Sequence, residues 1–237
     1  MVAGMLNDGP LKDGDTRDLI KRTALVLFAR DGLEGVSIRD IVRAAGQKNT
    51  GSVHYYFASK EALARELAGE IAQIIDTHRH RRIDAMEAAG GPRAVRDVLD
   101  ILIRLPHEEP GDLGFDTDMA AFVDMMMAKH PDLIFEGIHV ELGLATRRCL
   151  AHLRHMLPAL PSPLMEQRFR FAILYAFSIL SSRRSVGQRP DLWPPRWTEE
   201  VARQNLLDTL EGLLRQPASP ETMAALAPAP KRPSRKR

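Results

Sequence analysis

Apolar residues recur along this chain at the three- and four-residue spacing of α-helices. No stretch alternates with the two-residue period of a β-strand, so an all-α fold is predicted. The most informative stretch runs from Ser37 to Lys60, where two short helices are expected on either side of a turn. The first of them has one apolar face, made by Ile38, Ile41, Val42 and Ala45.

Local signals in this stretch mark where each helix begins and ends. Ser37 is a good N-cap, and Asp40 completes the capping-box spacing. Gly46 can take the left-handed conformation that ends a helix, and Ser59 can cap the next one. After the turn, Val53 and Phe57 are four residues apart and can point inward together. Together these signals are typical of a helix-turn-helix, whose second helix lies in the DNA major groove.

Outside this stretch the same periodicity predicts a run of further helices, about nine in all. Gly32 is expected to end the first helix, and Gly90 and Gly91 to end the longest. The basic end of that longest helix, HRHRRIDAMEAAGG, is predicted to be mostly solvated. The expected spans are Thr16–Asp31, Ser59–Ala89, Pro92–Leu105, Thr117–Lys129, Pro131–Met156, Leu164–Val186 and a last helix capped by Thr198.

Composition narrows the class of protein. The chain has 237 residues, a formal net charge of +2 and one cysteine, so an internal disulfide is excluded and a reducing cytoplasm is expected. The N-terminus, MVAGMLNDGP, lacks the basic and then apolar pattern of a signal peptide, so no secretion is expected. The longest apolar run, Ala172 to Leu180, falls far short of the roughly 20 residues of a membrane span, so no membrane partner is expected.

Motifs for catalysis are lacking: the sequence has no phosphate-binding glycine loop, nucleophile elbow or zinc-protease motif. Cys149, His152 and His155 are spaced three apart, but successive steps of three spread them over about 120° of a helix. We therefore expect no enzyme activity, no metal site and no cofactor.

Positive charge is concentrated near the predicted turn. Arg39, Arg43, Lys48 and Lys60 lie between Ser37 and Lys60, where Asp40 is the only acid. Binding to DNA phosphates requires such a local excess. The alternative is an ordinary helical hairpin with solvated charges, and the residues alone leave that alternative open.

The stretch resembles the DNA-binding domain of the TetR family of bacterial transcriptional regulators. The resemblance rests on FARDGLEG, S-IRDIVRAAG and VHYYF-SKEAL, and it is specific from about Thr16 to Leu67. The segment between Gly46 and Phe57 is one residue longer than is usual in that family, which leaves the start of the recognition helix open by about one residue.

The resemblance implies an N-terminal three-helix DNA-binding domain and a larger helical domain for ligand binding and dimerisation. It groups the helices into a DNA-binding domain at 16–60 and a second domain at 61–216. Composition predicts a disordered arm at 1–15, which is rich in Gly, Asp and Pro, and a disordered Pro/Ala-rich basic tail at 217–237. The DNA contacts expected from the residues and the resemblance are Arg39, Arg43, Lys48, Asn49, Thr50, Ser52, His54, Tyr55 and Lys60.

The family resemblance also implies an effector pocket and a homodimer. Methionine and aromatic side chains are the pocket candidates, although at helical spacing they equally fit ordinary core packing. The candidates are Phe122, Met125, Met126, Phe171 and Tyr175. For the dimer face we expect two stripes on the last two long helices, unless the chain's own core uses them: Phe169, Ile173, Phe177 and Leu180; Ala202, Leu206, Leu210, Leu213 and Leu214.

The resulting hypothesis is a dimeric repressor that binds a palindromic operator in double-stranded DNA and leaves it when a small apolar effector binds. An activator, or a regulator without a small effector, is the nearest alternative. A helical ligand-binding or catalytic protein with a vestigial helix-turn-helix is the rival from another class.

Overall fold

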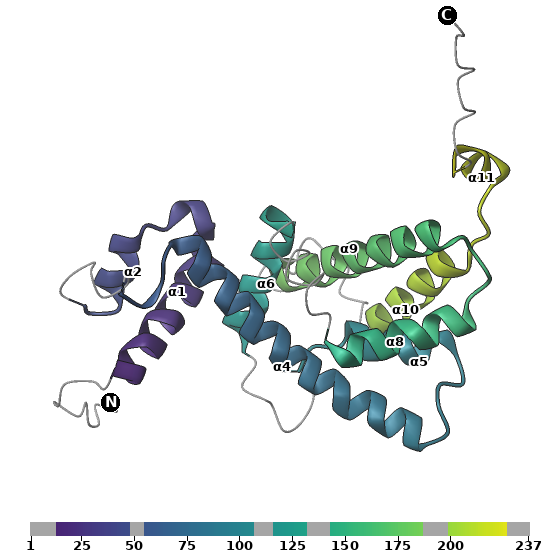
Figure 1. Cartoon of the computed structure of the whole chain (residues 1–237), viewed down its shortest axis with the longest axis horizontal. Helices are drawn as coiled ribbons and strands as arrows, with labels where there is room; N and C mark the ends of the chain where they lie inside the picture. The colour runs from purple at the N-terminus through teal and green to yellow at the C-terminus, as the bar shows by residue number, and fades with distance from the viewer. Residues whose placement is uncertain (1–12, 48–54, 107–115, 132–142, 187–198, 227–237) are drawn as a thin grey trace, which may run out of the picture.

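The computed structural model describes residues 13–47, 55–106, 116–131, 143–186 and 199–226. Within these residues it contains nine α-helices and no β-strand, in agreement with the predicted all-α class. The helices form a small N-terminal head and a larger bundle, joined by one long helix (Figure 1). No helix in the described part of the chain is long and apolar enough to cross a membrane.

The head begins with α1 (Asp13–Gly35) and α2 (Ile38–Ala44). Backbone geometry leaves the helical region at Gly32, with φ 78°, so the predicted break in α1 is confirmed. The predicted capping box of α2 is present: Ser37 Oγ accepts from the Asp40 backbone N–H, and the Asp40 carboxylate accepts from the Ser37 N–H. Gly46 follows with φ 66°, the left-handed turn that the sequence predicted.

The long helix α4 (Lys60–Ala88) has 29 residues. Ser59 caps it by accepting a hydrogen bond from the Ala62 N–H, as predicted. Gly90 and Gly91, both at positive φ, end it. At 1.5 Å per residue the helix spans roughly 44 Å and runs from the head to the far side of the bundle (Figure 1).

The bundle contains α5 (Val95–Ile103), α6 (Thr117–Lys129), α8 (Leu144–Met156), α9 (Ser162–Val186) and α10 (Glu199–Arg215). The bounds of α6 match the prediction. Helix α5 begins later than predicted because the Asp97 carboxylate accepts from the backbone N–H groups of Arg93 and Ala94 and so fixes its first turn. The predicted helix from Pro131 to Met156 is described as α8 in its second half, and residues 132–142 lie outside the described part.

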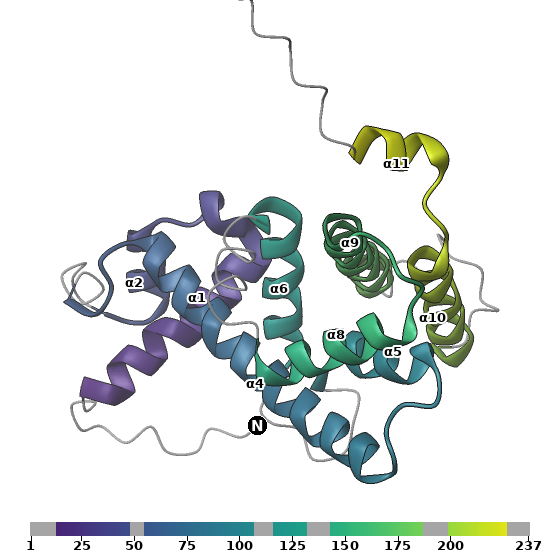
Figure 2. The same ribbon diagram turned by 45° about the vertical axis from the view of Figure 1, so that its right-hand side comes forward.

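A short helix, α11 (Pro220–Leu226), follows the bundle, so the prediction of a tail without structure from residue 217 is wrong for this segment. Ser219 caps it by accepting from the Thr222 N–H, and proline suits its first position. None of its residues is buried, and it stands apart from the bundle (Figure 2). Capping rather than burial therefore accounts for its start.

Two apolar cores lie along the molecule. The first joins α1, α2, the first half of α4 and α6, with Phe28, Ile41, Leu63 and Phe122 fully buried. The second joins the end of α4 with α5, α8, α9 and α10. Helix α6 thus belongs to the same core as the helix-turn-helix, although it follows about 57 residues after the start of α4 in the chain. The predicted domain boundary at residues 60–61 does not coincide with a gap between the two cores.

Candidate nucleic-acid interface and ligand cavity

The described surface of the head presents two of the predicted DNA contacts freely. Arg39 on α2 is exposed, and Tyr55 has 74% of its surface exposed. The Tyr55 ring packs edge-on against Tyr56, with centroids 4.9 Å apart, and this contact limits the directions that its hydroxyl can take. Lys48, Asn49, Thr50, Ser52 and His54, also predicted as contacts, lie outside the described residues.

Arg43 is exposed but already has an ionic partner. Its guanidinium donates to Asp40 at 2.7 Å, while 82% of its side chain remains exposed. Hydrogen bonds from Ser37 hold the pKa of the Asp40 carboxyl below its usual value, and Arg43 adds to the effect. Asp40 therefore stays ionised in its capping role, and a phosphate would share Arg43 with it.

Lys60, also predicted as a DNA contact, makes hydrogen bonds within the head. Its ammonium group donates to the backbone carbonyls of Leu33 at 2.6 Å and Val36 at 3.0 Å. The Leu33 carbonyl is in the last turn of α1, where a helix leaves carbonyls without intrahelical donors, and the Val36 carbonyl lies between α1 and α2. Lys60 therefore ties the start of α4 to the α1–α2 connection, and contact with a phosphate would compete with that bond.

The bundle encloses a cavity of about 870 Å³, within the range of small-molecule sites. It lies alongside the middle of α4, and α5, α6, α8, α9 and α10 also contribute to its walls. Most of the lining is aliphatic or aromatic, with Leu99, Leu102, Phe122, Leu153 and Phe177 among the apolar members. An apolar ligand body fits this lining.

Of the five predicted pocket residues, Phe122 lines the cavity. Met125 and Met126 are buried in the first core and are not part of the lining. Phe171 is half exposed on α9, and Tyr175 donates its hydroxyl to Thr209 Oγ1 on α10 at 3.1 Å. Periodicity identified apolar faces here, but it could not distinguish a face toward the cavity from a face toward the core.

Polar residues of α4 meet the N-terminus of α8 at one side of the cavity. The Asp76 carboxylate accepts from the Thr146 N–H at 3.3 Å and the Thr146 hydroxyl at 3.4 Å. It thereby takes the place of a capping side chain that the N-cap residue, Gly143, lacks. A Cβ at Gly143 would lie 1.8 Å from Asp76 Cγ, so the contact requires glycine.

Arg79 lies one turn further along α4 and also contacts this corner. It donates to Thr146 Oγ1 at 3.1 Å and to the Leu102 carbonyl at 2.8 Å. In the basic end of α4, which the sequence predicts to be mostly solvated, Arg79 is half-buried and His78 is buried. An HRHRR run shows no apolar period, so no sequence signal marked these two side chains as enclosed.

Helix α6 connects the cavity to the head. Phe122 lines the cavity and places its ring 6.4 Å from the ring of Phe28 in α1. At the start of α6, Arg22 of α1 pairs with Asp116 at 2.7 Å and Asp118 at 2.8 Å. On its other side, Asp124 receives a two-bonded contact from Arg184 of α9. A ligand that displaces α6 would therefore disturb the contacts of this helix with both α1 and α9.

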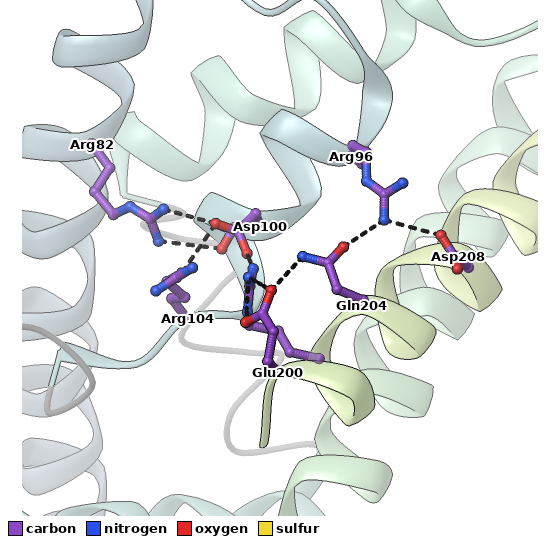
Figure 3. Close-up of polar contacts among 8 residues, drawn as sticks. Arg82, Arg96, Asp100, Arg104, Glu200, Gln204 and Asp208 are labelled. Atoms are coloured by element: carbon purple, nitrogen blue, oxygen red, sulfur yellow. Dashed lines mark hydrogen bonds and ion pairs between the residues drawn. The ribbon is translucent and has the colours of Figure 1, made fainter. Parts of the chain in front are cut away.

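A second polar cluster holds α10 against α4 and α5 (Figure 3). Arg82, Arg104 and Arg203 converge on the Asp100 carboxylate, with 2.8 Å to Arg82 and 3.0 Å to Arg104. Glu200 binds Arg203 from the outer side. Hydrogen bonds from Arg82 and Arg104 keep the pKa of Asp100 below its usual value although burial opposes them. The cluster joins three helices, and each of its three arginines pairs with the Asp100 carboxylate.

The cysteine and histidines of α8 lie in separate environments. Cys149 is buried, and burial raises the pKa of its thiol to about 11. His152 lies 2.9 Å from Glu87, while His155 is exposed. Within the described residues, no group of three or more histidine, cysteine or acidic side chains could hold a metal ion.

The two stripes predicted for a dimer face mostly serve the chain's own core. Phe169, Ala202, Leu206, Leu210 and Leu214 are buried, as the alternative interpretation allowed. Other apolar side chains of the same two helices are exposed instead: Phe171 at 50%, Leu174 at 38% and Val201 at 54%. The exposed apolar surface of α9 and α10 is thus offset from the predicted positions.

Residues 20–67 match the sequence profile described as bacterial regulatory proteins, tetR family. The transcriptional repressor KstR2 of Mycolicibacterium smegmatis is 35% identical over 81 residues, which is 31% of this chain and 39% of that protein. The chain therefore matches well under half the length of this curated relative. These matches show that the N-terminal part of the chain is similar to the helix-turn-helix domain of tetR-family regulators.

Two crystal structures share the fold over most of the chain. One, assigned to the tetR family of transcription regulators and from Shewanella sp. PV-4, has a TM-score of 0.53 at 19% identity. It covers 85% of this chain and 99% of its own. The superantigen PfiT has a TM-score of 0.50 at 15% identity, covering 84% and 97%. At such identities the likeness concerns the fold alone, and function must come from the sites.

Proposed function

We propose that the protein is a sequence-specific DNA-binding repressor that acts in the cytoplasm as a homodimer and leaves its operator when a small ligand fills the cavity. The observation that carries this proposal is that the capped helix α2, the left-handed Gly46 after it and the capped start of α4 all lie within the residues that match the tetR-family profile. Repression is the sign of regulation that the name of KstR2 supports.

Arg39 and Tyr55 are the described side chains best suited to touch DNA. Both are exposed, and Arg39 has no carboxylate partner among the described residues. Arginine binds phosphate oxygens, and a tyrosine hydroxyl can bond phosphates or base edges. Arg43 would add a contact that it shares with Asp40.

The homodimer is proposed through α9 and α10. Phe171, Leu174 and Val201 give these helices an exposed apolar surface that a second copy can cover. A two-fold dimer would set two heads on successive major grooves, about 34–36 Å apart, on a palindromic site. Glutamate at Phe171 should convert the dimer to a monomer in sedimentation velocity, while glutamate at exposed Met223 of α11 should not.

Ligand control would act through α4 and α6. Both helices line the cavity and belong to the core of the head. The protein with ligand and the protein without it would therefore differ in how α4 and α6 pack against the rest of the head. A ligand can shift this balance only by its difference in affinity for the two states, and a hundredfold difference is about 2.7 kcal/mol.

The experiment is fluorescence anisotropy with DNA from upstream of the protein's own gene, at two salt concentrations and with unrelated DNA as competitor. Tight binding that resists the competitor and weakens with salt supports the proposal. Binding no stronger than to the competitor, repeated with a genome-wide selection of bound fragments, would show that the helix-turn-helix does not read sequence.

A further inference from the structure

The cavity combines an apolar lining with one half-buried arginine whose Nε atom is buried. Leu99, Leu102, Leu153 and Phe177 are typical of its walls, and Arg79 projects from α4 at the side where α8 begins. Three other arginines line it: Arg65 and Arg147 are exposed, and Arg184 is paired with Asp124. Arg79 is therefore the arginine of the lining that a ligand inside the cavity would contact.

The hydrogen bonding of Arg79 is incomplete. Its two Nη groups donate to Thr146 Oγ1 and to the Leu102 carbonyl, both of which are neutral acceptors. Its Nε–H is buried and has no acceptor. A buried donor without a partner costs about 1–3 kcal/mol, and more when the group is charged. The guanidinium thus lacks one of the bonds that it could make.

Its charge is also uncompensated by direct contact. No carboxylate among the described residues lies within ion-pair distance of Arg79. The nearest acid on its own helix, Asp76, accepts from Thr146 and lies 3.4 Å from His80 Nε2. Burial lowers the pKa of Arg79, although Asp76 acts in the opposite direction. A half-buried guanidinium without an ionic partner favours the arrival of a counter-ion.

We propose that the cavity takes an amphipathic carboxylic acid, with its carboxylate on Arg79 and its apolar body along the leucine and phenylalanine walls. The inference rests on the proposed function in that the ligand is the effector, and it names the effector's chemical class. The planar guanidinium offers Nε–H and one Nη–H side by side, the arrangement that a carboxylate accepts with both oxygens. A ligand cation would meet the positive charge of Arg79 instead.

Capture of Arg79 would also alter a contact between helices. Each Nη carries two N–H donors, so a carboxylate on Nε–H and the adjacent Nη–H would share that Nη with Thr146 or with Leu102. The bond to Thr146 joins α4 to α8, and the bond to Leu102 joins α4 to the end of α5. The carboxylate would therefore compete for a donor that ties the middle of α4 to a neighbouring helix.

The test is displacement of the fluorescent probe N-phenyl-1-naphthylamine from the full chain by dodecanoate and by 1-dodecanol, which share one apolar tail. Wild-type protein should bind dodecanoate at least about tenfold more tightly than dodecanol. Arg79→Met should remove this preference by weakening dodecanoate alone, and Arg79→Lys should restore part of it. Arg81→Met, an exposed arginine two residues further on, should leave both ligands unchanged.

Equal binding of acid and alcohol by the wild type would overturn the proposal, as would equal loss of both in Arg79→Met or failure of the probe to bind at all. If Arg79→Met does not fold, the wild-type comparison and Arg79→Lys still decide. Anisotropy with operator DNA is measured separately. A protein that prefers dodecanoate through Arg79 but binds no DNA specifically would retain this inference and refute the proposed function.

Discussion

The rings of Phe28 and Phe122 lie 6.4 Å apart, and neither side chain is exposed. Phe28 belongs to the first helix of the head, whereas Phe122 lies on α6 and lines the ligand cavity. One pair of rings therefore connects the core beneath the DNA-binding surface with the wall of the pocket. A ligand that moves Phe122 would therefore act on the core of the head through this packing contact as well as along α4.

Replacing Phe122 with alanine should lower the free energy of unfolding by about 3–5 kcal/mol, because the change removes a fully buried ring and leaves a void beside an existing cavity. Urea denaturation followed by circular dichroism measures it. Met223→Ala, at an exposed position of α11, is the control and should change stability by less than about 0.5 kcal/mol. A loss below about 1 kcal/mol for Phe122→Ala would mean that the ring is not packed as described.

Arg39→Ala should weaken DNA binding without changing stability, because the side chain is exposed and has no partner among the described residues. Loss of one phosphate contact per head should reduce the slope of log K against log salt by about one for each head. Anisotropy over a range of salt concentrations measures the slope. Arg93→Ala, exposed in the loop after α4, should leave it unchanged, and an unchanged slope in both variants would remove Arg39 from the interface.

Lys60→Met should reduce both stability and DNA affinity, because it leaves the Leu33 and Val36 carbonyls without their donor. Unmet buried acceptors cost about 1–3 kcal/mol each, and the loosened α1–α2 connection would misplace the reading surface. Thermal unfolding and anisotropy on the same samples separate the possible roles. Loss of affinity with an unchanged melting temperature would instead indicate that Lys60 contacts phosphate directly.

Gly143→Ala should destabilise the protein by about 0.5–2 kcal/mol, since the new methyl group displaces the Asp76 carboxylate that caps α8. The effect should shrink in an Asp76→Ala background, where the carboxylate is already gone. A double-mutant cycle measures this coupling. Additive effects of the two changes would show that the glycine and the carboxylate act independently.

The loss of stability caused by Glu87→Gln should become smaller as the pH falls. Hydrogen bonds from Arg148 and His152 lower the pKa of Glu87 from 4.5 to about 2. A lowered pKa in the folded state stabilises the protein above about pH 4.5, and the benefit is lost as the pH falls toward 2. Because the group is solvent-exposed, the difference should not exceed about 1 kcal/mol.

Urea unfolding at pH 6 and pH 3.5 tests this dependence, with Glu166→Gln, another exposed carboxylate, as the control. The difference between wild type and Glu87→Gln should be larger at pH 6. If the two pH values give the same difference, the ion pair of Glu87 with Arg148 does not contribute to stability.

Local signals carried the sequence predictions that the structure confirmed. The Ser37 capping box, the Gly46 turn, the Ser59 cap and the bounds of α6 depend on residues within one helical turn of each other. Such features are set by backbone geometry and short-range hydrogen bonds. They are therefore readable from spacing alone.

Features that depend on distant neighbours were not predictable. Lys60 finds carbonyl partners 24 and 27 residues earlier, and Arg79 finds Thr146 67 residues later. The periodic stripe through Phe169 was identified as apolar, but only packing decides that the chain buries it while Phe171 stays exposed. Helix α11 was missed because it buries nothing, so it has no apolar stripe that periodicity could detect.

The participation of α6 in the first core has a consequence for recombining such proteins. A fragment ending with α4 would carry the helix-turn-helix but would expose the face of Phe28 that Phe122 of α6 covers. Exchange of the head with that of a relative at the junction near residue 60 would also pair a foreign α1 with this chain's Asp116 and Asp118. A functional chimera would have to carry over α6, or redesign its surface, along with the head.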